Sequence, residues 1–186
     1  MECGAYDGET ASNTLHLATN HGWSGILIEP NPYYYTQLVG RNRNVTSLNA
    51  CISAEHRASL LHVPLSCPEY KGLGCQQKSY IRNESREDTI PIPCFTFSSI
   101  MDAFGLTSLD YFSLDVEGAE LAILKTIPFD KYRIEFFSIE YKHSQGGSKA
   151  LTAFMTSQNY ELVKKIDVVD KKIGLFVYDL LFRLKA

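Results

Sequence analysis

Acidic side chains stand where apolar, strand-like runs of this chain end. The run Tyr111-Phe-Ser-Leu is followed by Asp115, and Glu117 and Gly118 come next, before a helical pattern begins. The run Ile26-Leu-Ile-Glu ends in the same way, and the opening segment Glu2-Cys-Gly-Ala-Tyr-Asp-Gly combines acids with glycines. In an open α/β sheet, ligands bind just outside the carboxyl ends of the strands. This pattern therefore predicts a cofactor site lined by carboxylates.

The first glycines favour a nucleoside cofactor that lacks a pyrophosphate. Gly4 and Gly8 permit a sharp turn after a strand and leave room for a ligand against the backbone. Tyr6 occupies the place of the second glycine of the G-x-G-x-x-G fingerprint, which disfavours a nicotinamide dehydrogenase. Glu29 follows the turn by about 20 residues, a spacing that suits an acid bonding both ribose hydroxyls. The alternative is a simple turn followed by a solvated acid.

Strand-like and helix-like segments alternate, which predicts an α/β fold with a mostly parallel sheet. Helices are expected at residues 11–21, 32–41, 96–104, 119–126 and 149–158. Strands are expected at residues 25–29, 45–52, 58–64, 89–95, 109–114 and 134–140, with a closing hairpin at 160–169 and 173–182. Residues 66–88 are predicted to be a loop inserted into a single domain, residues 1–186. Met1-Glu2-Cys3 is typical of the end of a strand, so we expect the start of that first strand to be missing.

Length and charge exclude several classes of protein. The chain has 186 residues, of which 45% are hydrophobic, enough for one domain with its own core. Its net charge of -3, without a cluster of Lys or Arg, argues against a nucleic-acid partner. No apolar run is long enough to span a bilayer.

Cysteines and glycosylation sequons bear on the cellular compartment. Cys67 and Cys75 bracket a polar loop and could form a disulfide. The other cysteines are interpreted as small buried thiols: Cys3, Cys51 and Cys94. Asn44 and Asn83 begin Asn-x-Ser/Thr sequons, which would suit a lumenal domain.

The sequence specifies no metal site. No Cys-x-x-Cys pair and no Cys/His cluster has the spacing of zinc ligands. Asp115 and Glu117 could hold a divalent ion, but two carboxylates alone do not specify one. We therefore predict no metal ligand from the sequence.

Several long motifs resemble those of the FkbM-type S-adenosylmethionine-dependent methyltransferases, and within that family the animal Star-like proteins. These motifs extend over nearly the whole chain: Glu2–Thr10, Asn13–Leu15, Gly22–Pro32, Asn49–Ser53 and Leu114–Leu121. The resemblance implies a Rossmann-like class I methyltransferase sandwich with a mostly parallel seven-stranded sheet and a C-terminal antiparallel hairpin. It also implies S-adenosylmethionine as the cofactor.

The resemblance assigns a role to each motif. Glu29 corresponds to the acid that binds the ribose, and the strand end at Asp115 to the one that faces the reacting methyl group. The positions implied to bind the cofactor are Glu2, Gly4, Ala5, Asp7, Gly8, Glu29, Pro30, Asn31, Asn49, Ala50, Cys51 and Asp115.

Methyl transfer to an oxygen needs a side chain that positions the acceptor hydroxyl and helps to remove its proton. Asp115 is the first candidate for this catalytic role, followed by Glu117 and Glu140. His143 lies just after a predicted strand end, and its ordinary pKa suits proton transfer near neutral pH. The alternatives are that Asp115 binds the ammonium of the cofactor, that Glu117 favours a helix N-terminus, and that His143 is a solvated loop residue.

Two classes of function follow. The first is an O-methyltransferase that acts on a hydroxyl of a glycan, a lipid or a small metabolite. The second is a non-catalytic Star-like domain that acts in membrane-cargo trafficking in the secretory pathway. The expected partners are accordingly an acceptor molecule or a membrane-protein cargo. The expected location is the secretory-pathway lumen, as part of a membrane-anchored protein, or else the cytoplasm.

Overall fold

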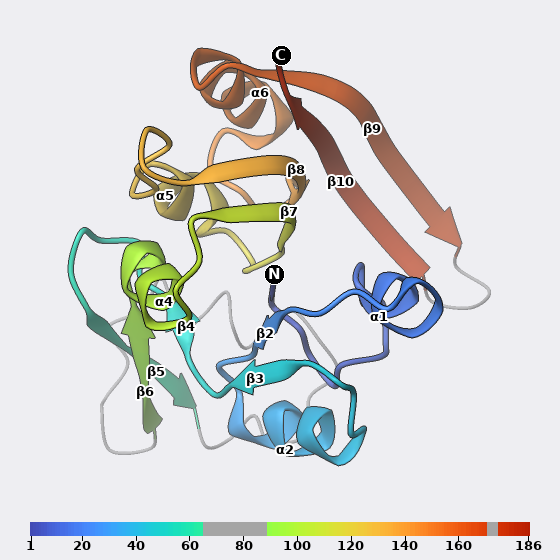
Figure 1. Cartoon of the computed structure of the whole chain (residues 1–186), viewed down its shortest axis with the longest axis vertical. Coiled ribbons are helices and arrows are strands. Elements are labelled where there is room, and N and C mark those ends of the chain that lie inside the picture. The colour runs from blue at the N-terminus through green and yellow to red at the C-terminus, as the bar shows by residue number, and fades with distance from the viewer. Residues whose placement is uncertain (65–88, 171–174) are drawn as a thin grey trace.

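Seven strands form the main sheet in the order β3-β2-β1-β7-β8-β10-β9 (Figure 1). The computed structural model describes residues 1–64, 89–170 and 175–186, so the predicted loop at 66–88, with Cys67, Cys75 and Asn83, lies outside the described residues. The strands are β1 (Glu2–Cys3), β2 (Ile26–Ile28), β3 (Thr46–Leu48), β7 (Ser108–Leu114), β8 (Arg133–Glu140), β9 (Tyr160–Asp170) and β10 (Leu175–Leu184). Neighbours are parallel from β3 to β8, and β10 is antiparallel to both β8 and β9. The predicted Rossmann-like fold is confirmed.

Helices cover both faces of this sheet. In the described part of the chain they are α1 (Leu15–His21), α2 (Pro32–Gly40), α4 (Phe97–Ala103), α5 (Glu120–Leu124) and α6 (Gly147–Ser157). From β1 to β3 each new strand is added towards one edge of the sheet, and from β7 to β8 towards the opposite edge. Because the crossover connections are right-handed, α1 and α5 lie on opposite faces of the sheet (Figure 1). None of these described helices has the length and apolar character needed to cross a membrane.

The strand order reverses between β1 and β7, where open α/β sheets bind their ligands. Cys3 lies opposite Leu114 in the ladder, so Gly4 and Asp115 follow at adjacent strand ends. Gly4 has φ +85°, and a Cβ on it would lie 1.8 Å from the carbonyl oxygen of Asp115. Glycine at this position therefore lets the two strand ends approach each other.

The predicted single strand at 45–52 is wrong, because the chain leaves the main sheet after Leu48. β4 (Cys51–Ile52) instead pairs with β6 (Thr89–Phe95) in a second sheet, which β5 (Ser59–Pro64) completes. Between the two strands, Asn49 Nδ2 donates hydrogen bonds of 2.9 and 3.0 Å to the carbonyls of Glu29 and Pro30. These bonds fix the chain where it turns away.

A disulfide joins Cys51 to Cys94 and links β4 to β6. The interpretation of these two cysteines as separate thiols is therefore wrong, whereas Cys3 is a free, buried thiol as expected. Pairing was missed because the two residues are 43 positions apart and only the second sheet brings them together.

The helix predicted at 11–21 begins later, at Leu15, because the preceding loop wraps around Glu2. The carboxylate of Glu2 accepts hydrogen bonds from Ser12 Oγ (2.8 Å), from the backbone N–H of Asn13 (2.9 Å) and from the hydroxyl of Thr14. These bonds hold the loop in a non-helical path beside β1.

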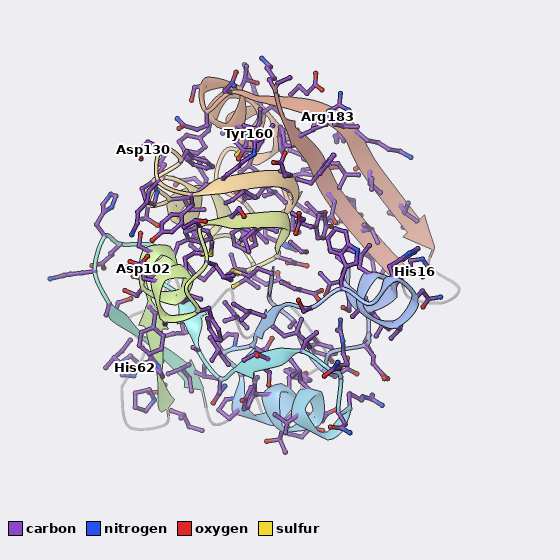
Figure 2. The ribbon with its side chains drawn as sticks, viewed as in Figure 1. His16, His62, Asp102, Asp130, Tyr160 and Arg183 are labelled. Atoms are coloured by element: carbon purple, nitrogen blue, oxygen red, sulfur yellow. A yellow bond between two sulfur atoms is a disulfide. The ribbon has the colours of Figure 1, made fainter. Side chains whose placement is uncertain are left out.

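Aromatic rings connect the elements that carry the site. Ring contacts run from Phe97 on α4 through Phe112 on β7 and Phe137 on β8 to Tyr160 on β9, with centroids 5.3 to 5.6 Å apart. Tyr160, labelled in Figure 2, also donates a 2.8 Å hydrogen bond to the carbonyl of Ile134. This packing fixes β7 and β8 relative to each other, and with them their carboxyl ends.

Candidate active site

A cavity of about 290 Å³ lies at the carboxyl ends of β7 and β8. All four residues predicted to be catalytic line it: Asp115, Glu117, Glu140 and His143. The remaining wall comes from the loop before α1, from Lys142 and from β10, and includes Asn13, Phe176, Tyr178 and Asp179. The structure thus brings together side chains from both ends of the chain.

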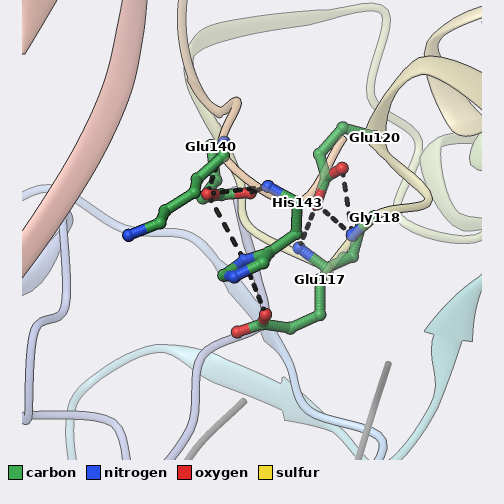
Figure 3. Close-up of polar contacts among 7 residues, drawn as sticks. Glu117, Gly118, Glu120, Glu140 and His143 are labelled. Atoms are coloured by element: carbon green, nitrogen blue, oxygen red, sulfur yellow. Dashed lines mark hydrogen bonds and ion pairs between the residues drawn. The ribbon is translucent and has the colours of Figure 1, made fainter. Parts of the chain in front are cut away.

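The segment that follows Asp115 is held in a strained conformation. Glu117 has φ +60°, which residues with a side chain rarely adopt, and a Cβ on Gly118 would lie 3.1 Å from the carbonyl oxygen of His143. Glu120, the first residue of α5, stabilises this turn because its Oε1 accepts 3.0 Å hydrogen bonds from the N–H groups of Val116 and Gly118 (Figure 3). Strain of this kind concentrates at functional sites.

His143 lies between two carboxylates that come from different strand ends (Figure 3). Its Nδ1 is 3.0 Å from Glu117 Oε2 and 3.5 Å from Glu140 Oε1. Glu140 also accepts hydrogen bonds from the backbone N–H groups of Lys142 (2.7 Å) and His143 (3.2 Å). The end of β8 therefore fixes the imidazole next to the strained turn after β7.

Burial shifts the pKa values of all four predicted catalytic residues. Burial, with the charges of Asp115 and Glu140, raises the pKa of Glu117 to about 9, and burial raises that of Glu140 to about 7. Burial, with the charge of Glu140, also raises the pKa of Asp115 well above its usual range. The pKa of His143 is lowered by burial and by Lys142. At neutral pH the imidazole is therefore uncharged and able to accept a proton.

Two carboxylate oxygens in this cavity lack hydrogen bonds. Asp115 Oδ1 and Glu117 Oε2 are buried and accept none from the residues that the structure describes. Although His143 Nδ1 is close to Glu117 Oε2, it is not aligned to donate. A buried polar atom without a partner costs about 1–3 kcal/mol of stability. A cationic ligand would supply the missing interactions.

The sequence did not reveal Asp179 and Asn13 as part of this cavity. Asp179 is 6% exposed and pairs with Glu140 in the ladder, and its carboxylate accepts a 2.7 Å hydrogen bond from Ser138 Oγ. Asn13 Nδ2 donates to Ser113 Oγ at 2.9 Å and to Asp179 at 3.4 Å. Asp179 is the only acid in the otherwise largely apolar run 175–184, and this is the signal that could have identified it.

The predicted ribose acid, Glu29, lies at the carboxyl end of β2, as expected from its position in the sequence. Its side chain is 0% exposed, and its two oxygens accept 2.8 Å hydrogen bonds from the N–H groups of Tyr6 and Asn31. Burial raises its pKa to about 7. A ribose could reach Glu29 only if the backbone around Tyr6 or Asn31 moves.

The other positions implied to bind the cofactor surround these strand ends and have structural contacts of their own. Asp7 accepts hydrogen bonds from the N–H groups of Glu9 (3.0 Å) and Thr10 (2.7 Å) and pairs with Arg41 at 3.2 Å. Asn31 caps α2 by accepting from the Tyr33 N–H at 3.0 Å. Pro30 and Ala50 are buried, as is Ala5. Their contacts with a cofactor remain predictions.

The comparison with known families identifies a domain over most of this chain. Residues 2–162 match the methyltransferase FkbM domain, whereas no curated protein and no solved structure matches the chain. The match covers most of the chain and includes the strand ends that carry Glu29, Asp115 and Glu140, but it ends before Asp179. The resemblance to the FkbM family is confirmed, and the Star-like subgroup stays a prediction. The chain therefore belongs to the FkbM methyltransferase domain family.

Proposed function

We propose that this chain is an S-adenosylmethionine-dependent O-methyltransferase whose acceptor is a hydroxyl group of a glycan, a lipid or a small metabolite. One observation carries the proposal: an uncharged histidine and two unpaired, buried carboxylate oxygens line one cavity beside the first family motif. A neutral base next to an acidic lining suits methyl transfer from a cationic donor to an oxygen.

The residues around the cavity fit the cofactor. Glu29 would bond the ribose hydroxyls after a local movement, and the segment from Glu2 to Gly8 would lie beneath the methionine part. The unpaired oxygens of Asp115 and Glu117 suit a ligand that carries positive charge. When bound, S-adenosylmethionine supplies the methyl group: the acceptor oxygen forms the new C–O bond as the S–C bond breaks, and the electron pair of the broken S–C bond stays on sulfur.

His143 is the side chain best placed to take the proton of the acceptor hydroxyl. Its Nδ1 lies beside Glu117, which leaves Nε2 as the atom that accepts the proton. The positive charge of the imidazolium that forms favours ionisation of Glu117, and the two groups would then pair through Nδ1. Asp115, at the strand end next to Gly4, would position the reacting groups, and Glu140 fixes the backbone of His143.

The cavity lining favours an acceptor rich in hydroxyl groups. Phe176 (52% exposed) and Tyr178 present aromatic rings beside the carboxylates of Glu140 and Asp179. Carboxylates accept hydrogen bonds from hydroxyls, while aromatic rings pack against the apolar face of a sugar. Among the three acceptor classes we therefore place glycans first.

Two further features support a lumenal location. The Cys51–Cys94 disulfide is of a kind that persists in oxidising compartments, and Asn44 of the Asn-Val-Thr sequon is exposed. Both suit a domain of the secretory pathway that meets glycans or glycolipids.

A second candidate function, a non-catalytic Star-like trafficking domain, is favoured by one specific observation. Glu29 is fully buried and already accepts two backbone hydrogen bonds, so its carboxylate is not presented to a ribose. If the segment around it does not move, the fold would serve only as a binding domain for membrane-protein cargo.

Transfer of radioactive methyl groups tests the proposal. Purified protein is incubated with S-adenosylmethionine that is tritiated in its methyl group and with pools of glycans, glycolipids and small hydroxylated metabolites. We expect label in one pool with the wild-type protein and none with Asp115→Asn. Absence of label from every pool, together with absence of cofactor binding, would favour the non-catalytic candidate.

A further inference from the structure

Three carboxylates lie close together at the carboxyl ends of β7 and β8 and at the start of α5. Asp115, Glu120 and Glu140 each offer an oxygen, and these oxygens all lie within 4.8 Å of one another. Opposite ligands of a Ca²⁺ ion are about 4.6–5.2 Å apart, and those of Mg²⁺ about 4.0–4.2 Å, given their ordinary metal–oxygen distances. We propose that this cluster binds one divalent cation of the kind that prefers oxygen ligands: Ca²⁺, Mn²⁺ or Mg²⁺.

A second observation points to a ligand at the same place. Asp115 belongs to the cluster, and its Oδ1 is buried and accepts no hydrogen bond from the described residues. Glu117, 4% exposed, lines the same cavity, and its Oε2 also accepts none. Buried carboxylate oxygens are ordinarily paired or bound to a metal. These buried oxygens, in and beside the cluster, therefore favour a cation at this end of the sheet.

The balance of charge favours a divalent ion over the methyl donor alone. Five carboxyl groups gather here: Asp115, Glu117, Glu120, Glu140 and Asp179. The basic side chains that line the cavity are His143 and Lys142, and the ammonium of Lys142 lies 3.8 Å from the centroid of the Tyr178 ring. S-adenosylmethionine carries a net charge of only one, which is less than the charge that five carboxylates can balance.

Glu120 can bind an ion without releasing the turn that it supports. Its Oε1 accepts from the N–H groups of Val116 and Gly118, and its Oε2 from that of Gly118 at 3.1 Å. A carboxylate offers about four lone-pair sites, so at least one remains for a metal. Ion binding would thereby be linked to the turn that carries Glu117.

The ion would have a catalytic use. A divalent cation that contacts the acceptor oxygen lowers the pKa of the hydroxyl and orients it towards the methyl group. His143 Nε2 would then accept the proton more readily. This catalytic role rests on the proposed methyl transfer, whereas binding of the ion does not.

Titration of Mn²⁺ into the chelator-treated full chain, followed by electron paramagnetic resonance, tests the site. We expect one Mn²⁺ per chain with a dissociation constant below 1 mM, competed by Ca²⁺ and Mg²⁺, as an order-of-magnitude estimate for a site with three carboxylates. Glu140→Gln should weaken Mn²⁺ binding by about tenfold or more. The amide oxygen can still accept from the N–H groups of Lys142 and His143, so the fold should persist.

Two further variants keep the outcome decisive. Asp130→Asn removes an exposed carboxylate at the periphery of the molecule (Figure 2) and should leave Mn²⁺ affinity unchanged. Asp115→Asn removes a proposed Mn²⁺ ligand and should weaken Mn²⁺ binding. Because Oδ1 of Asp115 accepts no hydrogen bond from the described residues, this variant should fold even if Glu140→Gln proves unstable. Equal Mn²⁺ affinity in the wild type and in Asp115→Asn, or no Mn²⁺ binding by the wild type, would overturn the metal site. Binding of S-adenosylmethionine without Mn²⁺ binding would leave the proposed function intact.

Discussion

The carboxylates at the ends of β1 and β2 differ from those at the end of β7 in the hydrogen bonds that they accept. Glu2, Asp7 and Glu29, here called the paired carboxylates, each accept at least two hydrogen bonds from nearby residues. Asp115 and Glu117, the unpaired carboxylates, each have a buried oxygen that accepts none from the described residues. The paired group shapes the backbone of the cofactor region. The unpaired group reduces stability and is suited to a ligand.

This difference separates two roles that the sequence pattern does not distinguish. An acid at a strand end can hydrogen-bond to a loop or bind a ligand, and the sequence pattern is the same in both cases. Natural proteins tolerate unfavourable interactions mainly where function requires them. Substitutions in the two groups should therefore have opposite signatures in stability and in activity.

The largest effect is expected for Asp115→Asn. Turnover should fall by about 10²–10⁴-fold, the range for loss of a group that positions or transfers a proton. The melting temperature should stay the same or rise, because no hydrogen bond to Oδ1 is lost and a buried acid beside other acids is replaced by a neutral amide. Rates of tritium transfer and thermal unfolding measure the two quantities. A marked fall in melting temperature would place Asp115 in the paired group.

Glu2→Ala should show the reverse signature. It leaves the N–H of Asn13 and the hydroxyls of Ser12 and Thr14 without their acceptor, which should lower the free energy of unfolding by about 3 kcal/mol. Urea denaturation measures this change. The control is Glu9→Ala, since the side chain of Glu9 is exposed and forms a surface ion pair, so the change should be within about 0.5 kcal/mol. Equal stability of the two variants would contradict a structural role for Glu2.

His143→Gln tests the base and should lower turnover by about 10²-fold. In the wild type, activity should fall at acidic pH as His143 becomes protonated, below its usual pKa because burial disfavours the charged ring. The variant should lose this acidic limb of the pH profile. An unchanged limb would show that another group removes the proton.

A smaller effect is expected on the pH dependence of the free energy of unfolding, through the paired carboxylate Glu29. Burial raises its pKa in the folded protein to about 7 from the ordinary value of 4.5, so the folded state holds this proton more tightly than the unfolded state. This contribution to the free energy of unfolding is fully present below pH 4.5 and is lost as pH rises through 7, a change of about 3 kcal/mol. Glu29→Gln should reduce this part of the slope in urea denaturation between pH 5 and 8. The same slope in both proteins would mean that Glu29 is ionised when folded.

Local patterns predicted much of this architecture. The strand-end acids Glu29 and Asp115, and the alternation of strands with helices, follow from short-range periodicity, which the main sheet preserves. The turn away from the sheet at Asn49 could not be predicted, because it depends on hydrogen bonds to the carbonyls of Glu29 and Pro30. Asp179 joins the cavity only through the antiparallel pairing of β10 with β8, a contact between distant segments.

The central claim is that this fold binds S-adenosylmethionine at the strand ends that carry Glu29 and Asp115. Calorimetric titration of S-adenosylmethionine and S-adenosylhomocysteine into the wild type and Glu29→Gln tests it most directly. We predict binding of both ligands by the wild type, and affinity reduced by about 10–100-fold in Glu29→Gln, as expected for loss of hydrogen bonds to the ribose. No binding of either ligand by the wild type would contradict the claim and favour a non-catalytic domain.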